Sequence, residues 1–165
     1  MARRNIRLVY GGASVGVMGA LADAALEEGG RVTGVIPRAL ALKEVAHHGL
    51  PELIVTESMH ERKTTMALRS DACIALPGGI GTLEELFEAW TWSQLGFQHK
   101  PCGLLNVQGY FDGLIRFIDH GVAEGFLRAE HRGILLVDTD AEALLDRIEA
   151  YEPPTIAKWI GADDT

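Results

Sequence analysis

Cysteine is scarce in this sequence, and long apolar runs are absent. The 165 residues include only two cysteines, Cys73 and Cys102, which lie inside apolar, strand-like stretches and not in a spaced framework. This placement is typical of buried free thiols and predicts a reducing compartment, the cytoplasm. The apolar runs reach only about six to eight residues, against the roughly 20 that cross a bilayer, so we expect no membrane helix.

The sequence also has fewer basic than acidic residues. The chain has 15 lysines and arginines against 23 acidic residues, a net charge of −8, which argues against a nucleic-acid polymer as partner. A small anion bound at one local basic site stays possible. The six histidines show no helical spacing with carboxylates or thiols of the kind that binds zinc, so we predict no metal and no cofactor.

The length and composition predict a single globular domain. A chain of 165 residues can bury a core without metals or cross-links, and its 19 glycines are spread between periodic segments. We expect one nucleotide-binding α/β domain over residues 1–152. Residues 153–165, which include Pro153, Pro154 and Trp159, are predicted to form a C-terminal tail.

Extended apolar runs alternate with amphipathic stretches of helical period. This alternation predicts an α/β fold with a doubly wound, Rossmann-like parallel sheet of about six strands and helices on both faces. Ligands of such sheets bind beyond the carboxyl ends of the strands. The expected strands are Ile6–Tyr10, Arg31–Ile36, Glu52–Thr56, Ala72–Leu76, Cys102–Val107 and Gly133–Val137, and the expected helices are Val17–Glu28, Arg38–Ala46, Met59–Arg69, Thr82–Leu95, Tyr110–Glu124 and Ala141–Tyr151.

A glycine-rich loop, Pro77-Gly78-Gly79-Ile80-Gly81-Thr82, follows one of these strands and opens a helix. Glycines let backbone N–H groups approach an anion closely, and a helix N-terminus adds unpaired donors. The loop matches neither the P-loop nor the dinucleotide fingerprint. A structural alternative exists, because Thr82 and Glu85 have the spacing of a capping box, as do Ser58 with Glu61 and Thr139 with Glu142. The three glycines favour the phosphate-binding interpretation.

Two cations, Arg62 and Lys63, fall in the first turn of a predicted helix, where the helix dipole disfavours them. A bound anion would compensate, whereas two surface residues with solvated heads are the alternative. We favour a functional role for this pair and a structural or solvent-exposed role for Arg69. The glycine-rich turn Gly11–Gly19 is a weaker candidate for a phosphate contact. Trp90, Trp92 and Phe97 are expected to pack in the core or at a subunit interface.

Several segments together resemble the LOG (Lonely Guy) family of cytokinin riboside 5′-monophosphate phosphoribohydrolases. The resemblance rests on Met59-His60-Glu61-Arg62-Lys63 and on the loop from Pro77 to Glu85, and it extends over roughly Leu8 to Phe126. It implies hydrolysis of the N-glycosidic bond between an N6-modified adenine and ribose 5-phosphate, with AMP as a poorer substrate. Such proteins have often carried the label lysine decarboxylase, but that activity needs a pyridoxal-phosphate lysine, which nothing in this sequence suggests.

The resemblance also implies the site residues and a homodimer. Arg62 and Glu85 match the catalytic pair of the family. An oxocarbenium-like transition state calls for a carboxylate, and an adjacent cation keeps that carboxylate ionised. The remaining matched positions imply the nucleotide site, with a nucleoside 5′-monophosphate as the substrate: Glu44, Met59, Lys63, Gly78, Gly79, Ile80, Gly81, Thr82, Leu83, Glu84 and Thr91.

One departure from the family pattern concerns the start of the chain. LOG-type chains begin with a further strand and helix, whereas only Met1 to Arg4 precede the segment that matches their second strand. We expect either a truncated start or a short member whose sheet edge is covered by a second subunit. Two other hypotheses stay open: a non-catalytic nucleotide-phosphate or molybdenum-cofactor-binding module, and a structural subunit that dimerises through the Trp90–Phe97 helix.

Overall fold

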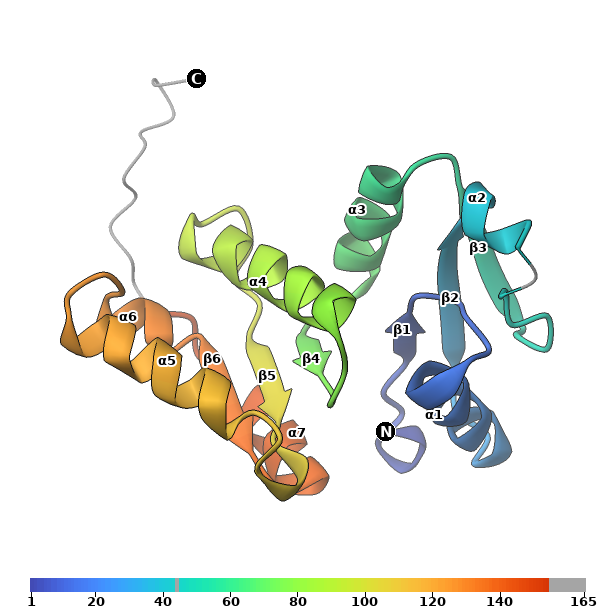
Figure 1. Ribbon diagram of the computed structural model, residues 1–165. Coiled ribbons are helices and arrows are strands. Elements are labelled where there is room, and N and C mark those ends of the chain that lie inside the picture. The colour runs from blue at the N-terminus through green and yellow to red at the C-terminus, as the bar shows by residue number, and fades with distance from the viewer. Residues whose placement is uncertain (44, 155–165) are drawn as a thin grey trace. The chain divides into compact units, whose positions relative to one another are not determined.

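The computed structural model describes residues 1–43 and 45–154, which divide into two compact units. The first unit is Met1–Ser70 and the second begins at Asp71. Figure 1 shows the elements of each unit along the chain. Within residues 1–43 and 45–154 no helix is long and apolar enough to cross a membrane.

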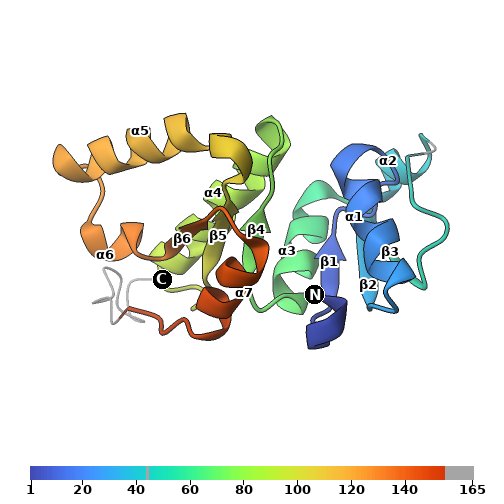
Figure 2. The same ribbon diagram turned by 90° about the horizontal axis from the view of Figure 1, so that it is seen from below.

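The first unit holds a three-stranded parallel sheet in the order β1-β2-β3. Strand β2 pairs with β1 from Leu8 opposite Val32, and with β3 up to Thr56 opposite Pro37. Helices α1 and α3 lie on either side of β1 (Figure 2). The elements are η1 Ala2–Arg4, β1 Leu8–Tyr10, α1 Gly16–Glu27, β2 Val32–Pro37, α2 Arg38–Ala41, β3 Glu52–Thr56 and α3 Met59–Arg69.

The core of this unit lies between the sheet and α1. Leu8, Tyr10, Ala22 and Val32 are buried together, because every residue of β2 is covered and α1 carries alanines on its inner side.

Arg69, the last residue of α3, donates from Nη1 to Glu52 Oε1 at 3.0 Å. The predicted structural role of Arg69 is therefore confirmed.

The second unit holds a separate parallel sheet, in the order β4-β5-β6. Cys102 on β5 lies against Ser93 of α4, whereas a side chain at the next position, Gly103, would contact Leu144 and Ile148 of α7. Helices therefore cover both faces of β5, as successive strand residues point to opposite faces. The elements are β4 Cys73–Ala75, α4 Ile80–Gln94, β5 Cys102–Leu105, η2 Val107–Gly109, α5 Asp112–Ala123, α6 Ala129–Arg132, β6 Leu135–Asp138 and α7 Ala141–Glu149.

Trp90 anchors the core of the second unit. Only 5% of this residue is exposed, and its indole Nε1 donates to the main-chain oxygen of His131 at 2.8 Å. Leu86, Leu104 and Phe111 are buried around it in the same cluster. The core role predicted for Trp90 is confirmed.

The α/β class and the six strands agree with the sequence, but the expectation of one six-stranded sheet is not met. In the described residues, the strand ladders form two sheets of three strands each. Strands β1 and β4 are only three residues long, and each is hydrogen-bonded to one neighbouring strand, β2 and β5 respectively. Alternation of strands and helices predicts the number of strands but not which strands pair, so the sequence did not predict two separate ladders.

The second predicted helix is also too long. Helix α2 ends at Ala41, not at Ala46. Ala46 instead forms an antiparallel bridge with Ala13, Ser14 N donates to the Val45 oxygen at 2.9 Å, and His47 N donates to the Gly12 oxygen at 2.8 Å. The backbone that would have continued the helix therefore bonds to the turn after β1, a tertiary contact that local helix propensity does not encode.

Other boundaries shift by a few residues. The predicted helix at Tyr110 begins at Asp112, because Asn106 turns the chain after β5 and its side-chain oxygen accepts from Phe111 N at 2.7 Å. Helix α7 is capped by Asp140, whose Oδ1 accepts from Ala143 N at 2.8 Å, and not by Thr139. The short helix α6 had no counterpart in the sequence prediction.

The two cysteines are neighbours in the second sheet. Cys73 on β4 is directly paired in register with Cys102 on β5, and both thiols are free. Burial raises the pKa of the Cys73 thiol to about 11, and the negative charge of Glu85 adds to this rise. Burial likewise raises the pKa of Cys102, with Cys73 contributing. Both thiols are therefore protonated near neutral pH.

His131 should make the stability of the protein depend on pH. The residue is 5% exposed, and its imidazole pKa is lowered by burial and by the positive charge of Arg128. An unfolded chain then takes up this proton first, at a pKa of about 6.5, so stability is lost as the pH falls below that value. We expect the thermal midpoint of the wild type to fall more between pH 7.5 and pH 5.5 than that of His131→Gln.

The exposed His99 provides the matched control for this measurement. His99→Gln should follow the wild type, because the side chain of His99 is exposed and its loss removes no buried contact. Equal pH dependence of the wild type and His131→Gln would show that the buried imidazole does not set the acid limit.

Candidate active site

The first unit gathers candidate residues at one edge of its sheet. The three parallel strands end at the same edge, where the turn Gly11-Gly12 follows β1 and α3 begins after β3. Ser58 caps α3, since its hydroxyl oxygen accepts from Glu61 N at 3.1 Å. Glu61 in turn accepts from Glu57 N at 2.8 Å, so the predicted capping pattern exists here in a shifted form.

Arg62 is held firmly in the first unit, although it is a charged residue. It is 9% exposed, its Nε donates to the main-chain oxygen of Val35 at 3.1 Å, and its Nη1 lies 3.4 Å from the Met59 sulfur. Val35 belongs to the fully buried strand β2. A buried guanidinium fixed to a strand is not a solvated surface cation, so the surface alternative for Arg62 is wrong.

Gly11 is shaped to fit this arginine. A Cβ added at Gly11 would collide with Nη2 of Arg62 and would lie 3.7 Å from the Met18 sulfur. The sequence suggested a phosphate contact for this turn, whereas the structure gives Gly11 the role of leaving room for the guanidinium. The pair of glycines directly after a strand was the available signal, but it did not identify the neighbour.

Alanine at Gly11 should reduce activity without unfolding the protein. The obstructing atom is the end of a flexible side chain, so the guanidinium can move and the fold is kept, but Arg62 leaves its position. With the catalytic role that the family resemblance implies for Arg62, we expect a loss of about 10- to 100-fold in kcat/KM, the usual cost of displacing a catalytic group by about 1 Å. Steady-state kinetics and thermal unfolding of Gly11→Ala measure the two effects.

Gly12→Ala should show the reverse pattern. Gly12 has a φ of 74°, and its Cβ would lie 3.1 Å from Leu53 Cδ1 and 3.2 Å from Val35 N, inside the packed sheet. This substitution should lower the unfolding midpoint. A Gly11→Ala protein with unchanged kcat/KM would contradict the role assigned to Gly11.

The other first-unit candidates lie on α3, with one exception. Met59 is 42% exposed and contacts Arg62, and Lys63 is partly buried one position further on. Met59, Arg62 and Lys63 are thus brought together by the first turns of α3. Glu44 lies outside the described residues, so its predicted role stays a prediction.

The second unit carries the glycine-rich loop between β4 and α4. Gly79 is the N-cap of α4, and the helix begins at Ile80. Added Cβ atoms at Gly79 and Gly81 would meet nothing within 4 Å, and Gly79, Ile80 and Gly81 are exposed at the start of the helix. At Gly78, by contrast, a Cβ would collide with the Thr82 hydroxyl. Open backbone donors at a helix N-terminus can hold an anion.

The capping-box interpretation of Glu85 does not fit this helix. Because α4 begins two residues before Thr82, Thr82 lies in the first turn and Glu85 in the second. Glu85 therefore does not reach back to the helix start as the glutamate of a capping box does. The negative charge of Glu85 contributes to the raised pKa of Cys73, the first residue of β4.

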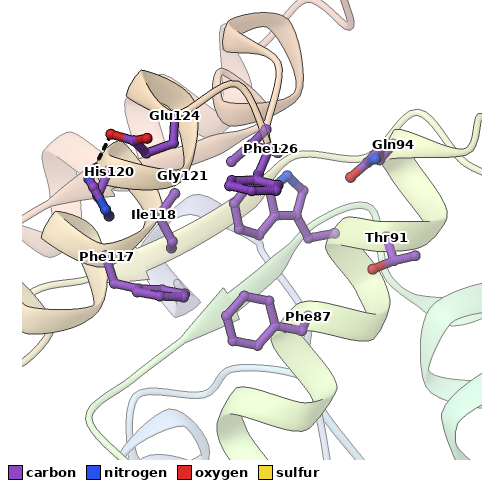
Figure 3. A pocket seen from close by; sticks show the side chains of 11 residues that line it. Phe87, Thr91, Gln94, Phe117, Ile118, His120, Gly121, Glu124 and Phe126 are labelled. Carbon is purple, nitrogen blue, oxygen red and sulfur yellow. Dashed lines mark ion pairs between the residues drawn. The ribbon is translucent and has the colours of Figure 1, made fainter.

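The remaining second-unit candidates differ in exposure. Leu83 packs against the buried core, whereas Ile80 is 82% exposed and Glu84 is exposed. Thr91 lies further along α4, where it lines a hollow of about 520 Å³ between α4 and α5. Figure 3 shows Phe87 and Phe117 facing one another across this hollow, with Thr91 at its side.

The structure thus brings the predicted residues together in two groups, each within its own unit. In the first unit, Met59, Arg62 and Lys63 share α3. In the second unit, the residues from Gly78 to Glu85 share the junction of β4 and α4, while Thr91 lies apart from them on the same helix. No group of three or more metal-ligating side chains occurs within residues 1–43 and 45–154.

Comparison with known proteins identifies similar sequences over most of the chain. Residues 18–148 match a family model described as "Possible lysine decarboxylase". The chain is 52% identical over 151 residues to a cytokinin riboside 5′-monophosphate phosphoribohydrolase of Rhodococcoides fascians, covering 91% of this chain and 76% of that protein.

Plant proteins are similar to nearly the same degree. A cytokinin riboside 5′-monophosphate phosphoribohydrolase of Arabidopsis thaliana is 49% identical over 150 residues, and a probable one of Oryza sativa subsp. japonica is 51% identical over 150 residues. Each alignment covers 91% of this chain and 66% of the relative. The chain therefore spans about two thirds to three quarters of the length of these relatives.

Proposed function

Since this chain belongs to the LOG family of cytokinin riboside 5′-monophosphate phosphoribohydrolases, we propose that it hydrolyses the N-glycosidic bond of N6-modified adenosine 5′-monophosphates, and of AMP. The products are the free base and ribose 5-phosphate, and no cofactor takes part. The observation that carries this function is the open, glycine-rich start of α4 with Glu85 in the following turn.

The candidate residues have different proposed roles in binding and catalysis. Backbone N–H groups of Gly79 to Thr82 bind the 5′-phosphate at the positive end of the helix dipole. Glu85 stabilises the oxocarbenium-like transition state or activates the attacking water. Arg62 is proposed as the second catalytic residue, a guanidinium held in place by the Val35 oxygen. The residues proposed to bind the substrate are Glu44, Met59, Lys63, Gly78, Ile80, Leu83, Glu84 and Thr91.

The whole chain is proposed to act as one cytoplasmic nucleotide-binding domain. On this view residues 1–152 form a single nucleotide-binding domain. Residues 155–165, most of the predicted C-terminal tail, lie outside the described residues. Two free cysteines with protonated thiols support a reducing compartment.

A homodimer is proposed as the working form. The face of α4 and α5 exposes large apolar side chains: Phe87 is 37% exposed, Phe117 71% and Phe126 91% (Figure 3). Apolar surface of this kind is typical of protein interfaces. Sedimentation velocity should give twice the monomer mass for the wild type and the monomer mass for Phe117→Asp.

Product analysis tests the enzymatic function directly. The purified protein is incubated with isopentenyladenosine 5′-monophosphate, its dephosphorylated riboside, and AMP, and the products are separated by chromatography. Base and ribose 5-phosphate should appear from the two monophosphates and not from the riboside. A folded protein that binds the monophosphate but releases no base would instead support a nucleotide-binding module.

A further inference from the structure

A tyrosine outside the predicted site is bonded to the glycine-rich loop. Tyr110 Oη donates to the main-chain oxygen of Gly78 at 2.7 Å, across 32 positions of the sequence. Tyr110 is itself 57% exposed, so burial of the side chain in a core does not account for this hydrogen bond. We infer that Tyr110 is a positioning residue, which aims the backbone N–H of Gly79 toward the phosphate of the substrate.

Peptide geometry connects the two groups. The oxygen of Gly78 and the N–H of Gly79 belong to one planar peptide unit, and no cis peptide bond occurs within residues 1–43 and 45–154. In a trans peptide these two groups point in opposite directions. A hydrogen bond that fixes the oxygen toward Tyr110 therefore also fixes the N–H, which points away from Tyr110. Gly79 is the N-cap of α4, where an N–H group can bind an anion.

Glycine needs such a restraint more than other residues. Gly78 and Gly79 are adjacent, so no side chain of their own restricts the peptide between them, although Thr82 packs closely against Gly78. A hydrogen bond to the Gly78 oxygen adds a directional restraint that selects one orientation before the ligand arrives. Such preorganisation increases affinity because less freedom is lost on binding.

Buried neighbouring residues hold Tyr110 in place. Its ring makes an edge-on contact with Phe111, with centroids 5.0 Å apart at 87°, and Phe111 is 2% exposed. Asn106 is 7% exposed and accepts from Phe111 N at 2.7 Å while donating to Asp112 Oδ1 at 2.8 Å. The tight turn before Tyr110 uses positive φ angles at Gln108 (51°) and Gly109 (73°). These contacts restrict the backbone and the ring of Tyr110.

The inference rests on the proposed phosphate role of the loop, and Tyr110→Phe tests it. This change removes one hydroxyl and keeps the ring contact with Phe111. We expect KM for the monophosphate to rise about three- to tenfold, the value of one hydrogen bond, while kcat changes less than twofold. Tyr151→Phe, in the same unit, is the matched control and should leave KM unchanged.

An NMR measurement separates this inference from the proposed reaction. In the wild type, AMP should shift the backbone amide resonance of Gly79, and this shift should be reduced in Tyr110→Phe and retained in Tyr151→Phe. If the wild type binds AMP but releases no base, the reaction is wrong and the Gly79 measurement still decides the role of Tyr110. An unchanged KM together with an unchanged Gly79 shift in Tyr110→Phe would overturn the inference.

Discussion

Replacing Glu85 with glutamine should lower the rate of base release by roughly 10²- to 10³-fold, the usual effect of removing a group that stabilises transition-state charge. The amide has the shape of the carboxylate but cannot carry the negative charge that a ribosyl cation requires. Affinity for the monophosphate should change little, because the glycine-rich loop that precedes Glu85 is intact. Single-turnover kinetics with isopentenyladenosine 5′-monophosphate and calorimetric binding of AMP measure the two quantities.

Glu88 provides the matched control on the same helix. Glu88→Gln removes an equal charge one turn further along α4, away from the glycine-rich loop. Its rate should stay within a few-fold of the wild type. If Glu88→Gln and Glu85→Gln lose activity equally, the general charge of α4 matters and Glu85 has no specific catalytic role.

The second large effect is expected for Arg62. Lysine at this position keeps the charge but cannot reproduce the planar guanidinium. The guanidinium donates from Nε to the Val35 oxygen and keeps two further nitrogens for other contacts. We expect Arg62→Lys and Arg62→Ala both to lose roughly 10²-fold or more in kcat. Arg62→Ala should also lower the free energy of unfolding by about 1 to 3 kcal/mol, because the Val35 oxygen loses its buried partner.

Arg69→Ala is the control that separates the loss of a positive charge anywhere on α3 from its loss at position 62. It ends α3, and its pairing with Glu52 is exposed, so such an ion pair contributes little to stability. Arg69→Ala should keep the wild-type kcat. Full activity of Arg62→Lys would contradict the need for a planar guanidinium, and kcat measured with saturating substrate decides the matter.

Local pattern predicted most of the fold because the strands are apolar and the longer helices are amphipathic. It failed at Ala46 because a distant segment bonds to the backbone there: Ala46 leaves the predicted helix to form a bridge with Ala13, and this contact has no signature in a window of a few residues. Asn106, by contrast, ends β5 early through a local contact, because its side chain caps the turn that leads to Phe111.

The candidate site residues could be proposed from the sequence because glycines in front of a helix are an uncommon pattern. Their supporting neighbours were not found. Tyr110 lies 32 positions from Gly78, and Gly11 is far along the chain from Arg62, so only the folded backbone brings them together. The start of α4 at Ile80 also removed the capping-box alternative for Glu85, which spacing alone had left open.

The two buried cysteines have a practical consequence for chemical labelling. Maleimides and iodoacetamides react with the thiolate, and the pKa of about 11 at Cys73 and the raised pKa at Cys102 keep both sulfurs protonated at the pH of such reactions. The native thiols should therefore react only slowly with these reagents. A cysteine introduced at an exposed position such as Leu68, which is 80% accessible, would carry a probe selectively without any prior removal of the native thiols.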